Sequence, residues 1–308
     1  MKYPYAAVLG GINLDICGRS HRTLIPEDSN PGTVTMSPGG VGRNIAHNLR
    51  LLSVETVFIT ALGGDAWSRK AEGDCRALGM NLDYAVHVPD GRISTYLFLT
   101  EPDGNMAMAI SDTAVASALT PAALEERLPI LNGAGAVVLD ANLPEDSIRY
   151  VAEHCSVPLF ADPVSVSKAD KIRPILSKLH TLKPNRMEAS RLSGIDIQDE
   201  RSLFSAADAL LATGLCRVVI SLENRGALLA EGQERILLPC YPTELVNVTG
   251  GGDAMMAALV YSGLAGKTLR ESGEFALAAA SMAVRCDVTN NPELSVSALE
   301  MIVKGETI

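Results

Sequence analysis

The sequence predicts an α/β fold with a mostly parallel central sheet flanked by helices. Short apolar segments alternate with amphipathic segments along most of the 308 residues, and this order is typical of successive βαβ units. Hydrophobic residues make up 47% of the chain but aromatic residues only 4%. Small aliphatic side chains must therefore fill the core, as they do in a parallel sheet covered by helices. We expect a single domain over residues 1–308.

The individual elements follow from the spacing of apolar residues. Consecutive apolar residues bounded by turn residues predict buried strands, whereas apolar residues three and four positions apart predict helices. The expected strands are residues 6–9, 56–62, 136–139, 158–161, 181–182 and 217–221. The expected helices are residues 42–52, 66–78, 121–131, 145–154, 185–192, 202–213, 251–262, 271–285 and 296–303.

Two segments, approximately residues 12–37 and 93–112, do not fit the alternation of strands and helices. Both contain β-like runs, and residues 102–104 have the sequence Pro-Asp-Gly, which is typical of a hairpin turn. We expect the two segments to pair into a small β lid that covers one edge of the main domain.

Charge and composition exclude several classes of function. With a formal net charge of -10, the protein would be repelled by the phosphates of DNA or RNA, and we expect no nucleic-acid partner. The six cysteines and five histidines are scattered, which argues against a metal cluster or a disulfide framework. No apolar run approaches the roughly 18 residues of a membrane helix, and residues 1–4 do not resemble a signal peptide. We therefore expect a cytoplasmic protein with reduced thiols.

The strongest chemical signal is a run of three glycines followed by an aspartate, Gly250, Gly251, Gly252 and Asp253, at the start of an apolar helix. Glycines leave successive backbone N–H groups open to a ligand, and the helix dipole adds partial positive charge. This arrangement suits a phosphoryl group in transfer, with Asp253 accepting the proton of the attacking hydroxyl. The alternative is a glycine-rich turn whose aspartate only caps the helix.

Two further motifs suit a substrate with several hydroxyl groups. Gly39 and Gly40 let a small polyol approach the backbone shortly before Asn44. Asn13 and Asp15 follow the first strand on one side of the chain, where they are spaced to bind two sugar hydroxyls. The alternatives are a flexible strand-to-helix turn for the first motif and an Asx-rich turn for the second.

A fourth motif suits a magnesium ion. Asn185 and Glu188 are three residues apart at the start of a predicted helix and face the same way. They are suited to hold the water shell of Mg²⁺ beside nucleotide phosphates, since Mg²⁺ keeps several waters and takes few protein ligands. The alternative is a capping box, which has the same spacing.

Together and in this order, the four motifs resemble the ribokinase-like (PfkB-type) carbohydrate kinase family. The resemblance extends from Gly10 to about Asn291. Within that family, Arg43 and the segment 28–32 (Asp-Ser-Asn-Pro-Gly) are most similar to the bacterial pseudouridine kinase subgroup.

The resemblance implies ATP-dependent phosphorylation of the ribose 5′-hydroxyl of pseudouridine, with Asp253 as the base and Gly250, Gly251 and Gly252 stabilising the γ-phosphoryl group. It implies a nucleoside-binding set of Asn13, Asp15, Gly39, Gly40, Arg43 and Asn44. It also implies an ATP-binding set of Lys183, Asn185, Ser221, Gly226, Thr249 and Asn290. Asn185 and Glu188 would organise Mg²⁺ through water, and two chains would form a homodimer through the lid. Residues 289–292 would lie near the adenine or near a loop that binds a monovalent cation such as K⁺.

The chain departs from the family pattern at two positions. Gly251 stands where relatives usually have alanine, a change that removes only a methyl group. Glu223 stands where relatives usually have glycine, and a carboxylate there would repel ATP phosphates unless it points away or pairs with Arg225. Two alternatives stay open: another nucleoside or sugar kinase of the family, and a nucleoside sensor that has lost turnover.

Overall fold

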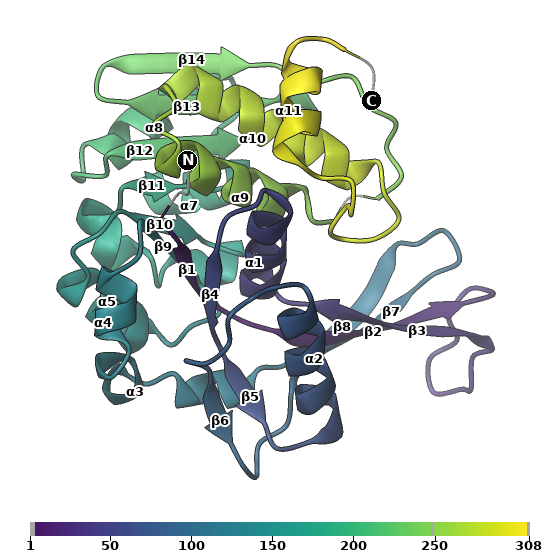
Figure 1. Ribbon diagram of the computed structural model, residues 1–308. Coiled ribbons are helices and arrows are strands. Elements are labelled where there is room, and N and C mark those ends of the chain that lie inside the picture. Colours follow the sequence, from purple (N-terminus) through teal and green to yellow (C-terminus); the bar gives the residue numbers. More distant parts are fainter. Residues whose placement is uncertain (1–3, 248, 307–308) are drawn as a thin grey trace.

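The computed structural model describes residues 4–247 and 249–306. The expectation that the N-terminal residues are not a signal peptide concerns residues 1–4, and residues 1–3 lie outside the described ranges. The central sheet contains, from one edge to the other, β14 (Glu234–Leu238), β13 (Ala227–Glu231), β12 (Arg217–Ser221), β11 (Thr181–Leu182), β10 (Leu159–Asp162), β9 (Ala136–Asp140), β1 (Ala6–Leu9) and β4 (Thr56–Ile59) (Figure 1). The strands from β12 to β4 are parallel, and β13 and β14 extend the sheet as an antiparallel hairpin. The predicted fold class is therefore confirmed.

Helices cover both faces of this sheet because its strands are apolar on both sides. In β1, Ala6 and Val8 point to one face and Ala7 and Leu9 to the other, and all four are buried. The first face packs against α1 (Val41–Leu51), α9 (Gly251–Leu264), α10 (Leu269–Val284) and α11 (Val296–Val303). The second packs against η1 (Ala114–Ala118), α3 (Pro121–Glu125), α4 (Leu128–Asn132), α5 (Glu145–His154), α6 (Val166–Ala169), η2 (Arg173–Lys178), α7 (Arg186–Ser193) and α8 (Glu200–Leu211). Among the described residues, no helix combines the length and apolarity needed to cross a membrane.

A second sheet extends away from the main body (Figure 1). Its strand order is β3 (Gly32–Gly39), β2 (Asn13–Ser20), β7 (Ser94–Thr100) and β8 (Met106–Asp112), so it joins two segments that are distant in the sequence. The register places Asp15 beside Tyr96 and Ile16 beside Leu97. Because side chains alternate along a strand, one face of this sheet carries Asp15 and the opposite face carries Ile16.

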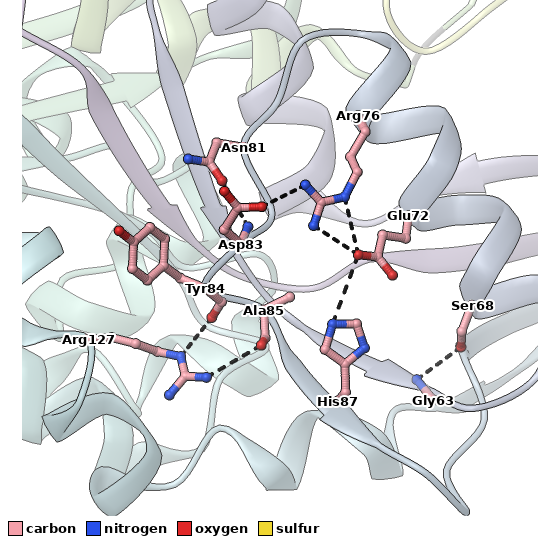
Figure 2. A network of polar contacts seen from close by, with 10 residues as sticks. All are labelled: Gly63, Ser68, Glu72, Arg76, Asn81, Asp83, Tyr84, Ala85, His87 and Arg127. Atoms are coloured by element: carbon pink, nitrogen blue, oxygen red, sulfur yellow. Dashed lines mark hydrogen bonds and ion pairs between the residues drawn. The ribbon is translucent and has the colours of Figure 1, made fainter.

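An ion pair links α2 (Ala66–Ala77) to the segment before β6 (Val86–Val88), the strand that pairs with β5 (Ala61–Gly63) in a small sheet. Arg76 of α2 bonds Glu72 one turn earlier and Asp83 in the segment before β6 (Figure 2). Arg127 donates to the carbonyl oxygen of Tyr84 in the same segment. Exposed pairs contribute about 0–1 kcal/mol each, so we expect them to orient α2 rather than to supply much of the stability.

Several elements differ from the sequence predictions. The expected helix 121–131 is two helices, α3 and α4, because Pro129 lacks the N–H that a continuous helix needs and its ring clashes with the preceding turn. The expected strand 56–62 ends at Ile59, where the chain leaves the central sheet and then pairs with β6. The hairpin of β13 and β14 was not predicted, although Gly232 lies in a turn between two largely apolar runs.

Candidate active site

The candidate site lies where several parallel strands end and two helices begin. In open α/β sheets, ligands bind outside the carboxyl ends of the strands. Here β9 ends at Asp140 and β10 at Asp162. The helices α1 and α9 pack against each other and both begin with glycines at their N-termini, so the first turns of two helices contribute to the same region.

The start of α9 requires glycine for two reasons. Gly250 caps the helix with a φ of 83°, a left-handed conformation that side chains disfavour. A Cβ atom at this position would also collide with the carbonyl oxygen of Thr289. No side chain of the described residues caps this helix, so the N–H groups of its first turn are available to an anion, where the helix dipole favours negative charge.

Asp253 lies in the first turn of α9 and has the properties of a general base. Its Oδ2 accepts a hydrogen bond of 2.8 Å from Nδ2 of Asn44 on α1. Burial raises the pKa of Asp253 to about 7, and the negative charge of Asp162 adds to this effect, whereas Asn44 and Lys183 oppose it. A carboxylate whose pKa lies near neutrality can both take up and release a proton at physiological pH.

Lys183 supplies a buried positive charge beside the start of α9. Its Nζ lies 3.1 Å from Oδ2 of Asp162, and both side chains are buried. Burial alone would lower the pKa of Lys183, but the charges of Asp162 and Glu188 outweigh it and raise the pKa. A Cβ atom on Gly252 would lie 3.3 Å from this Nζ. The ammonium group therefore reinforces the positive potential at the helix N-terminus.

Asp140 anchors the loops that lead into α1. Its Oδ2 accepts hydrogen bonds from the backbone N–H groups of Gly11 (2.9 Å) and Gly42 (2.8 Å), and its Oδ1 accepts one from Asn142 (2.8 Å). Asp140 is fully buried, and burial raises its pKa despite these three donors. It thereby ties the end of β1 to the first turn of α1.

The lid contributes Asp15 from β2, on the same strand face as Asn13. Burial raises the pKa of Asp15 to about 6, and the positive charge of Arg43 opposes this rise. Its Oδ1 is buried without a hydrogen-bond partner among the described residues. A Cβ atom on Gly39 would collide with this carboxylate, so glycine leaves the room that Asp15 occupies. An unsatisfied buried acceptor of this kind suits a ligand hydroxyl.

Asn185 and Glu188 form the capping box that the sequence left as an alternative. Oδ1 of Asn185 accepts from the N–H of Glu188, and Oε2 of Glu188 accepts from the N–H of Asn185, both at 2.9 Å. Glu188 is buried, and burial raises its pKa with a further contribution from Asp162. The cap uses the single side-chain oxygen of Asn185 and one of the two carboxylate oxygens of Glu188.

The other predicted nucleotide residues border this region. Ser221 ends β12 and forms a bridge to Asn185. Gly226, with a φ of 97°, follows the exposed turn η3 (Glu223–Arg225). Glu223 itself adopts a φ of 56°, a conformation that glycine accepts more readily. Thr249 is exposed just before α9.

The sequence prediction assigned Arg43 to the nucleoside and Asn290 to ATP. Both are buried and hydrogen-bonded to each other, with 2.8 Å between Nη1 of Arg43 and Oδ1 of Asn290. The structure thus brings the two side chains together between α1 and the segment that follows α10.

Sequence reasoning missed Asp140 and Asp162. Each is the last residue of a buried parallel strand, and the two are paired in the sheet register. An aspartate that closes an otherwise apolar strand is a signal that could have identified both, because buried carboxylates need specific donors or cations.

The fold and the glycine-opened helix with its partly buried aspartate define a kinase of the ribokinase-like class. The chain belongs to the pfkB family of carbohydrate kinases, whose family model matches residues 4–295, and the predicted family is therefore confirmed. It is accordingly a phosphotransferase that acts on an alcohol group of a sugar or nucleoside, and kinases of this family use ATP.

The chain is similar to particular kinases over nearly its whole length. The chain is 37% identical to pseudouridine kinase of Escherichia coli over 304 residues, which cover 98% of this chain and 97% of that protein. It is 35% identical to the uncharacterised sugar kinase YeiI of the same organism, over 97% of this chain and 83% of the relative. Among solved structures, ribokinase of Arabidopsis thaliana with ribose and ATP superposes with a TM-score of 0.84 at 25% identity, over 98% of this chain and 99% of the other.

Proposed function

We propose that the protein transfers the γ-phosphoryl group of ATP to the 5′-hydroxyl of pseudouridine, giving pseudouridine 5′-phosphate and ADP. The observation that carries this proposal is the 37% identity to a pseudouridine kinase over 98% of the chain. The arrangement of Asp253 beside Asn44 at the N-terminus of α9 supports the same reaction.

In the proposed mechanism, the nucleoside lies between the lid and the start of α9. Asn13, Asp15 and Asn44 bind ribose hydroxyls, and the unpartnered Oδ1 of Asp15 accepts one of them. Asp253 takes the proton of the 5′-hydroxyl as the new O–P bond forms and the bond to the ADP oxygen breaks. The N–H groups of residues 250–252 stabilise the negative charge on the γ-phosphoryl oxygens.

The residues near Lys183 fit the phosphates of ATP with a hydrated Mg²⁺. The buried ammonium of Lys183 would balance phosphate charge, and Glu188 offers its second carboxylate oxygen to a metal-bound water. In the described part of the chain, no three His, Cys, Asp or Glu residues are grouped to hold a metal, so the ion would take most ligands from water and phosphates. When bound, Mg²⁺ would neutralise charge on those phosphates.

The test is ADP release by the purified protein with ATP, Mg²⁺ and K⁺, with pseudouridine, uridine, inosine, guanosine, ribose and fructose 6-phosphate offered in parallel. We expect kcat/KM to be highest for pseudouridine. A clear preference for another acceptor would contradict the substrate and leave the kinase class intact. If calorimetry showed that an acceptor binds but no acceptor were phosphorylated, the result would favour the nucleoside sensor that has lost turnover. Glu223→Gly would then test whether glycine at this position restores turnover.

A second candidate substrate class is a purine nucleoside. The chain is 26% identical to guanosine-inosine kinase of Exiguobacterium acetylicum over 82% of its length. This relative is more distant than the pseudouridine kinase, so inosine and guanosine serve as the main competitors in the assay.

We also propose that two chains pair through the face of the lid that is opposite Asp15. The strand register aligns apolar residues across this face, and most of them are more than half exposed. They are Val34, Met36, Leu97, Met108 and Ile110. A contiguous exposed apolar patch of this kind is typical of an interface. Light scattering after size exclusion should give twice the mass of one chain, and Met108→Glu should give a single chain; one-chain mass for the unmodified protein would contradict the pairing.

A further inference from the structure

We propose that Arg43 is a positioning residue that fixes the side-chain amide of Asn44, so that Asn44 donates its hydrogen bond to Asp253, and that Asn290 holds Arg43 in this role. The inference rests on the proposed function, because it concerns the base of that reaction. It revises the sequence prediction that Arg43 binds the nucleoside directly.

A continuous chain of hydrogen bonds leads from Asn290 to the proposed base. Nη1 of Arg43 donates to Oδ1 of Asn290 (2.8 Å) and to Oδ1 of Asn44 (2.7 Å). Nδ2 of Asn44 then donates to Oδ2 of Asp253 (2.8 Å). Nδ2 of Asn290 donates back to the carbonyl oxygen of Asn44 (3.0 Å) and to Oδ1 of Asn48 (2.9 Å). Both amides are thereby held in one orientation.

The orientation of the Asn44 amide decides whether the carboxylate of Asp253 faces a hydrogen-bond donor or a second oxygen. An amide has an oxygen that accepts and a nitrogen that donates. Because Arg43 has only donors, it must face the oxygen of Asn44, and the nitrogen then faces Asp253. If the amide were reversed, its oxygen would face the carboxylate of Asp253 and repel it.

Burial makes Arg43 better suited to this role than to substrate contact. Its exposed fraction is 6%, and those of Asn290 and Asn48 are 7% and 1%. The same Nη1 also reaches the carbonyl oxygen of Pro38 at 3.4 Å. A buried guanidinium that already bonds several protein acceptors would have to give up these bonds to reach a substrate.

Other charged groups also act on the two residues, so the effect of Arg43 must be measured against them. Asp162 and Asp140 raise the pKa of Asp253 and Lys183 lowers it. The groups that face Arg43 itself are Asp15, Cys75 and Asp253, together with His47, whose pKa burial and the charge of Arg43 lower to about 4. All of these groups remain when Arg43 alone is replaced.

The test is Arg43→Met, which keeps a long side chain and removes both the donors and the charge. Without Arg43, the amide of Asn44 is no longer held with its nitrogen toward Asp253, so Asp253 loses a hydrogen-bond donor. Asp253 also loses the nearby positive charge of Arg43. Both losses should raise the pKa of Asp253. We expect kcat to fall about 10- to 100-fold, and the acidic limb of the pH profile of kcat/KM to move up by about one pH unit. The control is Arg50→Met, at the other end of the same helix, where Arg50 is paired with Glu55. It should leave kcat within about twofold and the acidic limb where it is in the unmodified protein.

Two further variants keep the inference testable if Arg43→Met does not fold. Arg43→Lys keeps the charge but loses the planar fork, and Asn290→Ala keeps Arg43 but removes its anchor. Each should lower kcat and move the acidic limb in the same direction by less. A rise in KM for the nucleoside alone, with the acidic limb unchanged, would overturn the inference in favour of direct contact.

Failure of the proposed reaction can be distinguished from failure of this inference. The carboxyl carbon of Asp253 can be titrated by NMR in protein labelled with ¹³C-aspartate, without any substrate, and assigned with an Asp253→Asn sample. We expect the pKa of Asp253 to be higher in Arg43→Met than in the unmodified protein. An unchanged pKa would overturn the inference whether or not pseudouridine is the substrate.

Discussion

Replacing Asp253 by asparagine should lower kcat by about 10²- to 10⁴-fold, the contribution usual for a positioned general base. Asparagine has nearly the same shape and its oxygen can still accept from Asn44, so the dissociation constant of the nucleoside should change by less than about threefold. Initial rates of ADP release give kcat, and isothermal titration calorimetry gives nucleoside binding.

The matched control for this substitution is Asp146→Asn. Asp146 also lies in the first turn of a helix, α5, but it is exposed and paired with Arg149. Its replacement should leave kcat within about twofold. If the Asp253 variant kept comparable activity, Asp253 would not be the base, and another group would have to take the proton.

Replacing Asp140 by alanine should reduce the free energy of unfolding by about 3 kcal/mol or more. The carboxylate accepts hydrogen bonds from the N–H groups of Gly11, Gly42 and Asn142. Each buried donor left without a partner costs about 1–3 kcal/mol. Because Gly42 lies in the first turn of α1, we also expect a higher KM for the nucleoside. Urea denaturation and nucleoside saturation curves measure the two effects.

Asp112→Ala serves as the control for this loss of stability. Asp112 is exposed at the end of β8 and accepts one backbone N–H, that of Ala114, at 3.1 Å. Its loss should cost less than about 1 kcal/mol, since water replaces the lost bond. A cost for Asp140→Ala no larger than this control would show that water or a shifted backbone satisfies the three donors.

The sequence predicted elements best where apolar residues were periodic and turn residues were clear. The strand β1 and the helices α5 and α11 were predicted with the bounds that the structure has. The expected helix 121–131 was wrong because Pro129 affects the chain locally while the apolar spacing continues through it. Apolar spacing reports burial, and it does not report where a backbone hydrogen bond is missing.

For the site, local sequence was sufficient where chemistry depends on adjacent residues. Gly250 and Asp253 stand together in the chain, and the start of a helix follows from the same few residues. The contacts of Asp162 and Arg43 could not be predicted in this way. Asp162 meets Lys183 across neighbouring strands, and Arg43 meets Asn290 across most of the chain.

The sequence by itself therefore determined the fold class, the kinase family and the glycine-opened helix that carries Asp253, because each depends on local periodicity or on a short motif. Only the tertiary structure decided the partners of Asp253, its raised pKa and the burial of Arg43. Those properties depend on distances between side chains from different strands and helices and on the exclusion of water around them, and spacing along one chain specifies neither.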